Sequence, residues 1–360
     1  MSKQKADTGC CEKFKSKIGG QALIEGIMML GPNTGAMACR HPDGTIDLET
    51  WAVNHGKTAP WYKKTPLVRG CVSFVNSLVK GYKYMMKSAE KQMTEEEKAE
   101  EAKKKHMDVP AEEASETAPE LSGAVSIDGD LAAPTGELGS KVINSSNSEK
   151  KGGDAVMTGA MYVGVVLGIV LAVGLFVMLP KYIIGLFPAV KSHRIARSIL
   201  EGVVKIVIFV LYMYLVSLTK DIKRQYMYHG AEHKTIACHE AELPLTVENV
   251  RKQTRFHKRC GTSFIFIVLI ISIFVMCFVP FTVTWQRIIA SLVLLPLVVG
   301  ISFECIRLAG NKDNTFTRIL SAPGLAMQRI TTREPDDSMI EIAIAALTPC
   351  IPQDKSEDKW

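Results

Sequence analysis

Residues 260–286 read CGTSFIFIVLIISIFVMCFVPFTVTWQ, which is 27 residues without a charged side chain between Arg259 and Arg287. A second uncharged run of 26 residues, at 155–180, reads AVMTGAMYVGVVLGIVLAVGLFVMLP. Both runs exceed the roughly 20 apolar residues that cross the hydrocarbon core of a bilayer. They place the chain in the class of α-helical integral membrane proteins, and they make the lipid bilayer its first expected partner.

Two further apolar segments accompany these runs, at 198–219 and at 288–308. In chain order the four segments are 155–180, 198–219, 260–286 and 288–308. The fourth segment is interrupted by Pro296, and it follows the third so closely that the two form a tight hairpin. We therefore predict about four transmembrane helices, as a pair within 154–220 and a hairpin within 261–308.

The rest of the chain divides by composition into polar units around the spans. Pro42 and Gly44 favour a turn between two short strands, which predicts a β-hairpin within a small N-terminal α+β soluble unit. Apolar residues of 67–79 recur at spacings of three and four, which is typical of an amphipathic or membrane-surface helix. The segment 93–153 is too polar to form a core. The predicted units are the N-terminal unit 1–65, the amphipathic helix 66–90, a disordered linker 91–153, a His-rich loop 221–260 and a C-terminal tail with a helix, 309–360.

The charge balance excludes several classes of protein. With 43 Lys and Arg against 37 Asp and Glu, the net charge of +6 is too small for the basic stripe of a nucleic-acid binder, so no nucleic acid is expected as a partner. The nine cysteines show no framework spacing, which excludes a secreted disulfide scaffold and indicates reduced thiols facing the cytosol. The polar segment 1–17 has no apolar core, so we expect no cleavable signal peptide.

The distribution of basic residues predicts the orientation of the spans. Nine Lys and Arg residues lie between the second and third segments, within 220–260, against four between the first and second. The positive-inside rule therefore places this loop in the cytoplasm, and an even number of spans puts both termini there as well.

The most specific chemical pattern lies in that loop. Residues 229–233 read HGAEH, an HxxEH arrangement. If the segment is helical, His229 and His233 share one face and bind the same metal ion, while Glu232 is placed beside them as general base. Imidazole and carboxylate ligands make Zn²⁺ the expected metal. The pattern is HExxH reversed, as in the inverzincins.

A catalytic zinc site needs a third protein ligand and leaves one position open. Glu304, near the cytoplasmic end of the fourth segment, is our first candidate for this ligand. His257 and Cys260 form an alternative pair just before the third segment, and together with His229 and His233 they would close a four-ligand structural site. A third interpretation assigns these side chains to hydrogen bonds at the membrane interface, without a metal.

Four blocks of the sequence are long and distinctive. They read GGQALIEGIMM (19–29), YHGAEHKT (228–235), HKRCGTS (257–263) and PGLAMQRITTREP (323–335). These blocks resemble the YqhQ-like family, bacterial membrane proteins of unknown function that are sometimes labelled predicted metal-dependent enzymes. The resemblance extends over nearly the whole chain except 93–153, and it implies a multi-pass protein of the bacterial cell membrane.

These patterns lead to one main functional hypothesis and two alternatives. The main hypothesis is a metal-dependent hydrolase at the cytoplasmic membrane face, acting on a membrane-protein or lipid-linked substrate, with a peptide bond and a lipid-linked ester both open. The first alternative is a non-catalytic membrane scaffold or assembly factor with a structural metal site. The second is a small transporter, although the sequence lacks the internal repeat that such folds use. The sequence leaves the oligomeric state open.

Overall fold

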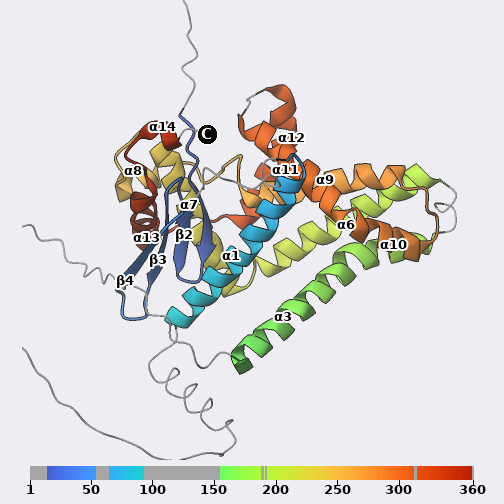
Figure 1. Cartoon of the computed structure of the whole chain (residues 1–360), viewed down its shortest axis with the longest axis horizontal. Coiled ribbons are helices and arrows are strands. Elements are labelled where there is room, and N and C mark those ends of the chain that lie inside the picture. The colour runs from blue at the N-terminus through green and yellow to red at the C-terminus, as the bar shows by residue number, and fades with distance from the viewer. Residues whose placement is uncertain are drawn as a thin grey trace, which may run out of the picture.

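The chain combines a part built on a small β-sheet, which we call the polar part, with a part made of helices, which we call the apolar part (Figure 1). A computed structural model describes residues 14–53, 65–92, 155–187, 190, 193–311 and 314–358. The expected linker 91–153 lies outside the described residues except for its first two positions.

The sheet has four antiparallel strands in the order of the chain. The strands are β1 (Gly19–Leu23), β2 (Gly26–Leu30), β3 (Thr34–Arg40) and β4 (Ile46–Ala52). Strands β3 and β4 form the hairpin expected around Pro42 and Gly44. Gly44 has a φ of 88°, a left-handed conformation that glycine adopts without steric cost. The sheet is therefore a simple meander with short connections.

Helices cover both faces of this sheet. Met28 and Met37 point toward α1 (Val68–Gln92), while Ile27 and Met29 pack against two other helices on the opposite face. Those helices are α7 (Lys220–Glu240) and α13 (Asp337–Leu347). The N-terminal unit, the expected loop 221–260 and the C-terminal tail therefore share one core.

The segment expected to be a His-rich loop is mostly helical, since α7 occupies its first half and the short α8 (Val247–Arg251) follows. Gly230 lies inside α7 although glycine disfavours helices. A Cβ atom at Gly230 would lie 2.0 Å from the carbonyl oxygen of Arg333, so only glycine lets the two backbones approach this closely.

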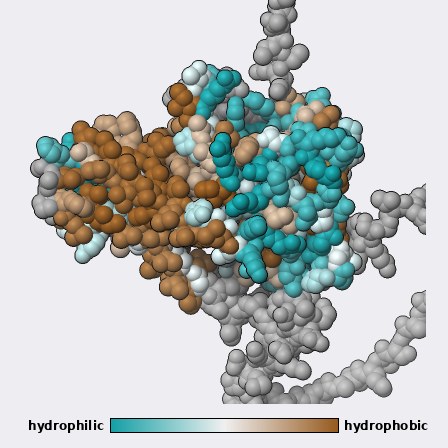
Figure 2. Space-filling view, turned by 180° about the vertical axis from the view of Figure 1, so that it is seen from behind, coloured by the Kyte–Doolittle hydropathy of each residue, from teal (hydrophilic) through white to brown (hydrophobic). Residues whose placement is uncertain are grey.

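Three stretches are long and apolar enough to cross a membrane: 163–185, α6 (Arg194–Val216) and α9 (Gly261–Phe278). The first stretch joins the end of α3 (Ala155–Val173) to the π-helix η2 (Gly174–Met178) and α4 (Leu179–Gly185). The expected fourth span is a pair of helices, α10 (Thr284–Val293) and α11 (Leu295–Asn311), bent by 51° at Leu294. Figure 2 shows the continuous apolar surface of this part beside the polar part. The described residues thus contain three candidate spans, and four if the bent pair is one span.

The C-terminal region links the two parts. Helix α12 (Thr315–Thr331) packs along α9, and α13 then returns to the sheet. The chain ends in the 3₁₀ helix η3 (Thr348–Cys350) and the short α14 (Lys355–Asp358), where Asp358 accepts a hydrogen bond from the Ser16 hydroxyl.

Candidate functional site

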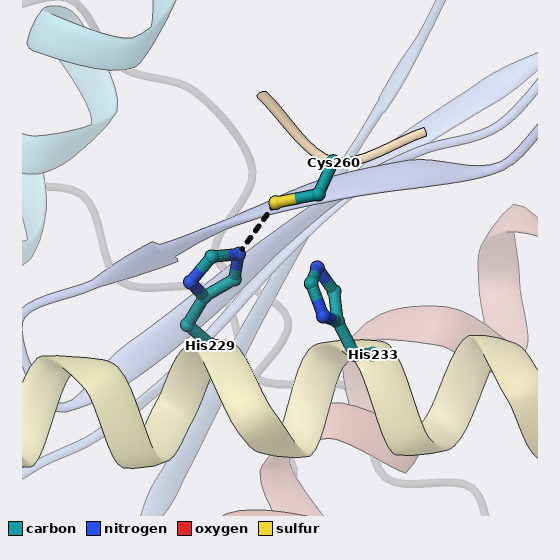
Figure 3. Close-up of side chains that lie close together, drawn as sticks. All are labelled: His229, His233 and Cys260. Carbon is teal, nitrogen blue, oxygen red and sulfur yellow. Dashed lines mark hydrogen bonds between the residues drawn. The ribbon is translucent and has the colours of Figure 1, made fainter. Parts of the chain in front are cut away.

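Two histidines of α7 and one cysteine at the start of α9 converge on a single point (Figure 3). His229 and His233 are four residues apart, so their rings project from the same face of the helix. Cys260 is the residue that precedes the first turn of α9, and its Sγ atom faces both rings. One ligand atom from each of the three side chains lies within 4.8 Å of the other two. This distance allows all three to bind one metal ion.

Backbone carbonyl groups fix the orientation of both imidazoles. Nδ1 of His229 lies 2.8 Å from the carbonyl oxygen of Thr331, and Nδ1 of His233 lies 2.6 Å from that of Arg255. Because a carbonyl oxygen only accepts hydrogen bonds, each Nδ1 carries the proton and donates. When the ring is neutral, Nε2 then carries the lone pair, which is the arrangement found in histidines that bind metals.

The cysteine and the first histidine are placed to form an ion pair. Cys260 Sγ lies 3.2 Å from His229 Nε2. Burial raises the pKa of the Cys260 thiol, but the charges of His229 and His233 lower it more, to well below 9.0. Burial lowers the pKa of His229, but the Cys260 thiolate raises it more, to about 9. These surroundings favour the thiolate of Cys260, which is the form of cysteine that binds metals.

Glu232 lies beside this cluster with one oxygen engaged and the other free. Its Oε1 atom accepts a hydrogen bond of 3.1 Å from the backbone N–H of Gly20. Its Oε2 atom is buried and has no hydrogen-bond partner among the described residues. Burial raises the pKa of Glu232, although His229 and His233 oppose the shift. A carboxylate with a raised pKa and a free oxygen is suited to accept a proton.

A pocket of about 260 Å³ adjoins these groups. Its lining includes the three clustered side chains, Glu232 and the backbone of Gly20. A Cβ atom at Gly20 would lie 2.8 Å from the carbonyl oxygen of Met28 and 3.0 Å from Cδ of Glu232. Glycine at this position lets the strand approach the carboxylate.

His257 also lines the pocket but belongs to a different set of contacts. Its Nε2 atom lies 3.7 Å from Oε2 of Glu240, and Glu240 also pairs with Arg259. Burial lowers the pKa of His257, and the neighbouring Glu240 offsets only part of this shift. The structure therefore brings together three of the four residues of the alternative set, because Cys260 joins the two histidines while His257 faces Glu240.

The expected third ligand, Glu304, lies elsewhere. Both of its carboxylate oxygens accept hydrogen bonds from Arg69 of α1, with Arg69 Nε at 2.7 Å. Sequence placed Glu304 at the end of a span, and the structure packs this end of α11 against α1. The structure therefore brings Cys260, not Glu304, to the two imidazoles.

One residue that sequence reasoning missed holds the cysteine loop in place. Gln328 of α12 is fully buried, and its amide bridges both backbone groups of His257 at 2.8 Å. The same amide nitrogen donates to the Ser263 hydroxyl at 3.2 Å. These bonds fix the loop on both sides of Cys260. Gln328 and Gly20 both lie within the distinctive blocks, which was the only signal available for them.

Comparison with known proteins gives a family but no activity. A family model described as "Protein of unknown function (DUF1385)" matches residues 65–353. The "Uncharacterized protein YqhQ" of Bacillus subtilis is 32% identical over 333 residues, covering 92% of this chain and 91% of that protein. No solved structure matches the chain.

Proposed function

The chain belongs to the DUF1385 family of unknown function, in agreement with the YqhQ-like resemblance, and we propose that it is a membrane-associated, zinc-dependent hydrolase. The observation that carries the proposal is the convergence of His229, His233 and Cys260 within 4.8 Å, next to the free oxygen of Glu232. Family membership supplies no activity, so the argument rests on these side chains.

The donor set fits zinc. Zinc favours imidazole nitrogen and thiolate sulfur in tetrahedral sites, and three protein ligands leave one position for water or substrate. The surroundings of Cys260 favour its thiolate, and the Nδ1 atoms of both histidines are fixed by carbonyl groups. When bound to such ligands, zinc acts as a Lewis acid and makes water acidic near neutral pH. The pocket beside the three ligands leaves room for that fourth position.

Glu232 would serve as the general base. The hydrogen bond from the Gly20 N–H holds its Oε1 atom, which leaves Oε2 to accept a proton from water in the pocket. Its burial and raised pKa favour proton exchange at a pH nearer to neutrality than for an exposed carboxylate. The protonated carboxyl would then donate this proton to the leaving group.

The site lies at the boundary of the apolar part, because Cys260 directly precedes the candidate span α9. This position favours a substrate at the membrane surface, either a peptide bond of a membrane protein or a lipid-linked ester. The excess of basic residues in 220–260 favours a cytoplasmic location for this face, with both termini on the same side.

A second candidate function is nucleophilic catalysis by Cys260 itself. The 3.2 Å contact with His229 and the position of Cys260 before the first turn of α9 favour it. A thiolate paired with a protonated imidazole at a helix N-terminus is the usual form of a nucleophilic cysteine. The structural-site alternative is less favoured, because His257 faces Glu240 and the fourth position stays open.

Metal analysis of the purified full-length protein tests the proposal. We expect about one zinc per chain in the wild type, and loss of zinc in His229→Ala and His233→Ala. Glu304→Gln is the matched control, since it removes a carboxylate charge and should keep the metal. A wild type that neither retains zinc nor takes up added zinc would contradict the proposal and favour the cysteine mechanism.

A further inference from the structure

Five charged side chains gather where α4, α6 and α10 meet, and we call them the intramembrane charge cluster. They are Lys181, Arg197, Glu201, Lys205 and Arg287. Lys181, Arg197, Glu201 and Arg287 are between 0% and 4% exposed. Charged groups inside a membrane protein are costly to bury, so each needs a compensating partner or marks a functional site.

The cluster lies far from the metal site. Helices α6 and α9 are antiparallel neighbours, and the Ser198 hydroxyl next to the cluster donates to the carbonyl oxygen of Met276 at 3.0 Å. Met276 is 16 residues beyond Cys260 along the chain, which corresponds to roughly 24 Å of helix. This length approaches the hydrocarbon thickness of a bilayer. The two sites therefore belong to opposite ends of the spans.

Arg197 and Arg287 both bind the carboxylate of Glu201, the single anionic side chain of the cluster. Arg197 Nε donates to Glu201 Oε1 at 2.9 Å, and Arg287 Nη2 donates to Glu201 Oε2 at 3.0 Å. Arg287 also donates to the Ser198 hydroxyl, and Arg197 to the Thr284 hydroxyl. The guanidinium groups are thus well satisfied, and both oxygens of Glu201 are engaged by them.

The two lysines lack such a partner. Lys181 Nζ donates to the carbonyl oxygen of Val177 in its own helical segment at 3.3 Å, and Lys205 Nζ to the Ser272 hydroxyl at 3.4 Å. No carboxylate of the described residues forms an ion pair with either ammonium group. Glu201 attracts both lysines through space, while Lys205 repels Lys181. Four cationic side chains therefore face one anionic side chain, which leaves an excess of positive charge for an anionic ligand.

The surroundings indicate the depth of lipid headgroups. Tyr182, next to Lys181, is 64% exposed, and Trp285, two residues before Arg287, is 60% exposed. Exposed Tyr and Trp side chains beside an apolar surface are typical of the interface between headgroups and hydrocarbon. We propose that Lys181 and Lys205 bind the phosphate of an anionic lipid, in the leaflet opposite to the metal site. This site is independent of the proposed hydrolase function.

Lipid binding to the purified full-length protein in zwitterionic nanodiscs tests the proposal. Native mass spectrometry would compare the retention of phosphatidylglycerol with that of phosphatidylcholine. We expect a preference for phosphatidylglycerol in the wild type, reduced about fivefold for each lysine removed in Lys181→Met/Lys205→Met. The control Lys252→Met/Lys355→Met loses the same charge from exposed positions of the polar part and should keep the preference.

Two further arms keep the test decisive. Lys181→Arg/Lys205→Arg retains the charge and should retain the preference, which separates lipid binding from a folding defect. Equal retention of both lipids by the wild type, or an unchanged preference in the methionine variant, would overturn the proposal. If inorganic phosphate alone raised the melting temperature as much as phosphatidylglycerol does, the ligand would be a free anion and the lipid assignment would fall.

Discussion

The Sγ atom of Cys260 lies 3.2 Å from Nε2 of His229, although one residue begins an apolar helix and the other lies within a polar helix. This contact joins the membrane part of the protein to its sheet-based part. The same contact determines the ionisation of both residues in the metal-free protein.

We predict that Cys260 is a thiolate at about pH 7 in the metal-free protein. Its pKa lies well below 9.0, and the pKa of His229 is raised to about 9, so the ion pair should persist at neutral pH and be lost as the pH rises through about 9. His229→Gln removes the cation, and burial then raises the pKa of the thiol. The pH titration of ultraviolet thiolate absorbance, taken as wild type minus Cys260→Ser, checks this. A wild-type thiol that ionises only near pH 9 would contradict the ion pair.

Gly230→Ala should destabilise the protein. Its Cβ would lie 2.0 Å from the carbonyl oxygen of Arg333, so α7 must shift away from the chain that follows α12. We expect a loss of about 1–3 kcal/mol in unfolding free energy, as for overpacked cores. The control is Gly168→Ala in α3, where no atom lies within 4 Å of the added methyl group. Thermal unfolding followed by circular dichroism measures the melting temperature of both variants. A melting temperature of Gly230→Ala equal to that of the wild type would show that the helix tolerates the methyl group.

Gln328→Met should weaken metal binding more than it weakens the fold. The amide holds the backbone of His257 and the hydroxyl of Ser263, on either side of Cys260. Loss of such supporting bonds typically reduces metal affinity about 10–100-fold. Zinc competition titration against a chelator measures it. Gln92→Met is the control, because its half-buried amide in α1 donates to the carbonyl oxygen of Arg40, away from the cluster. An unchanged zinc affinity in Gln328→Met would mean that the loop is fixed by other contacts.

The cytoplasmic location of residues 220–260 remains a prediction, and the structure strengthens the count of basic residues on which it rests. Two of the four basic residues that counted against a cytoplasmic 220–260 segment, Lys181 and Arg197, are buried in the intramembrane charge cluster. Single cysteines in an otherwise cysteine-free chain test it: Lys252→Cys should resist an impermeant reagent in intact cells, and Thr282→Cys should react. The reverse pattern of labelling would invert the topology.

Much of the fold follows from sequence because a bilayer demands long uncharged runs. The runs at 155–180 and 260–286 became candidate spans for that reason, and the spacing of His229 and His233 placed both on one helix face. Sequence could not predict that the sheet packs against α7 and α13. Strands that are buried on both faces lack the alternation of apolar and polar residues, so their sequence does not indicate which helices cover them.

The third ligand shows where sequence reasoning stops. Glu304 and Cys260 both lie next to an apolar segment, and sequence favoured Glu304 as the third ligand. The choice depends on helix packing: α11 meets α1 through the Arg69–Glu304 pair, whereas the start of α9 meets α7. The role of Gln328 could not be predicted from sequence either, because no sequence pattern distinguishes a buried glutamine of an amphipathic helix from an exposed one.

The most direct test of the three-ligand metal centre is the absorption spectrum of the cobalt-substituted protein. Cobalt(II) bound to a thiolate gives a near-ultraviolet charge-transfer band, and its visible bands report tetrahedral geometry. We predict both features in the wild type and in Glu232→Gln, and loss of the charge-transfer band in Cys260→Ser. A wild-type spectrum without the charge-transfer band, or one that Cys260→Ser leaves unchanged, would contradict the metal centre proposed here.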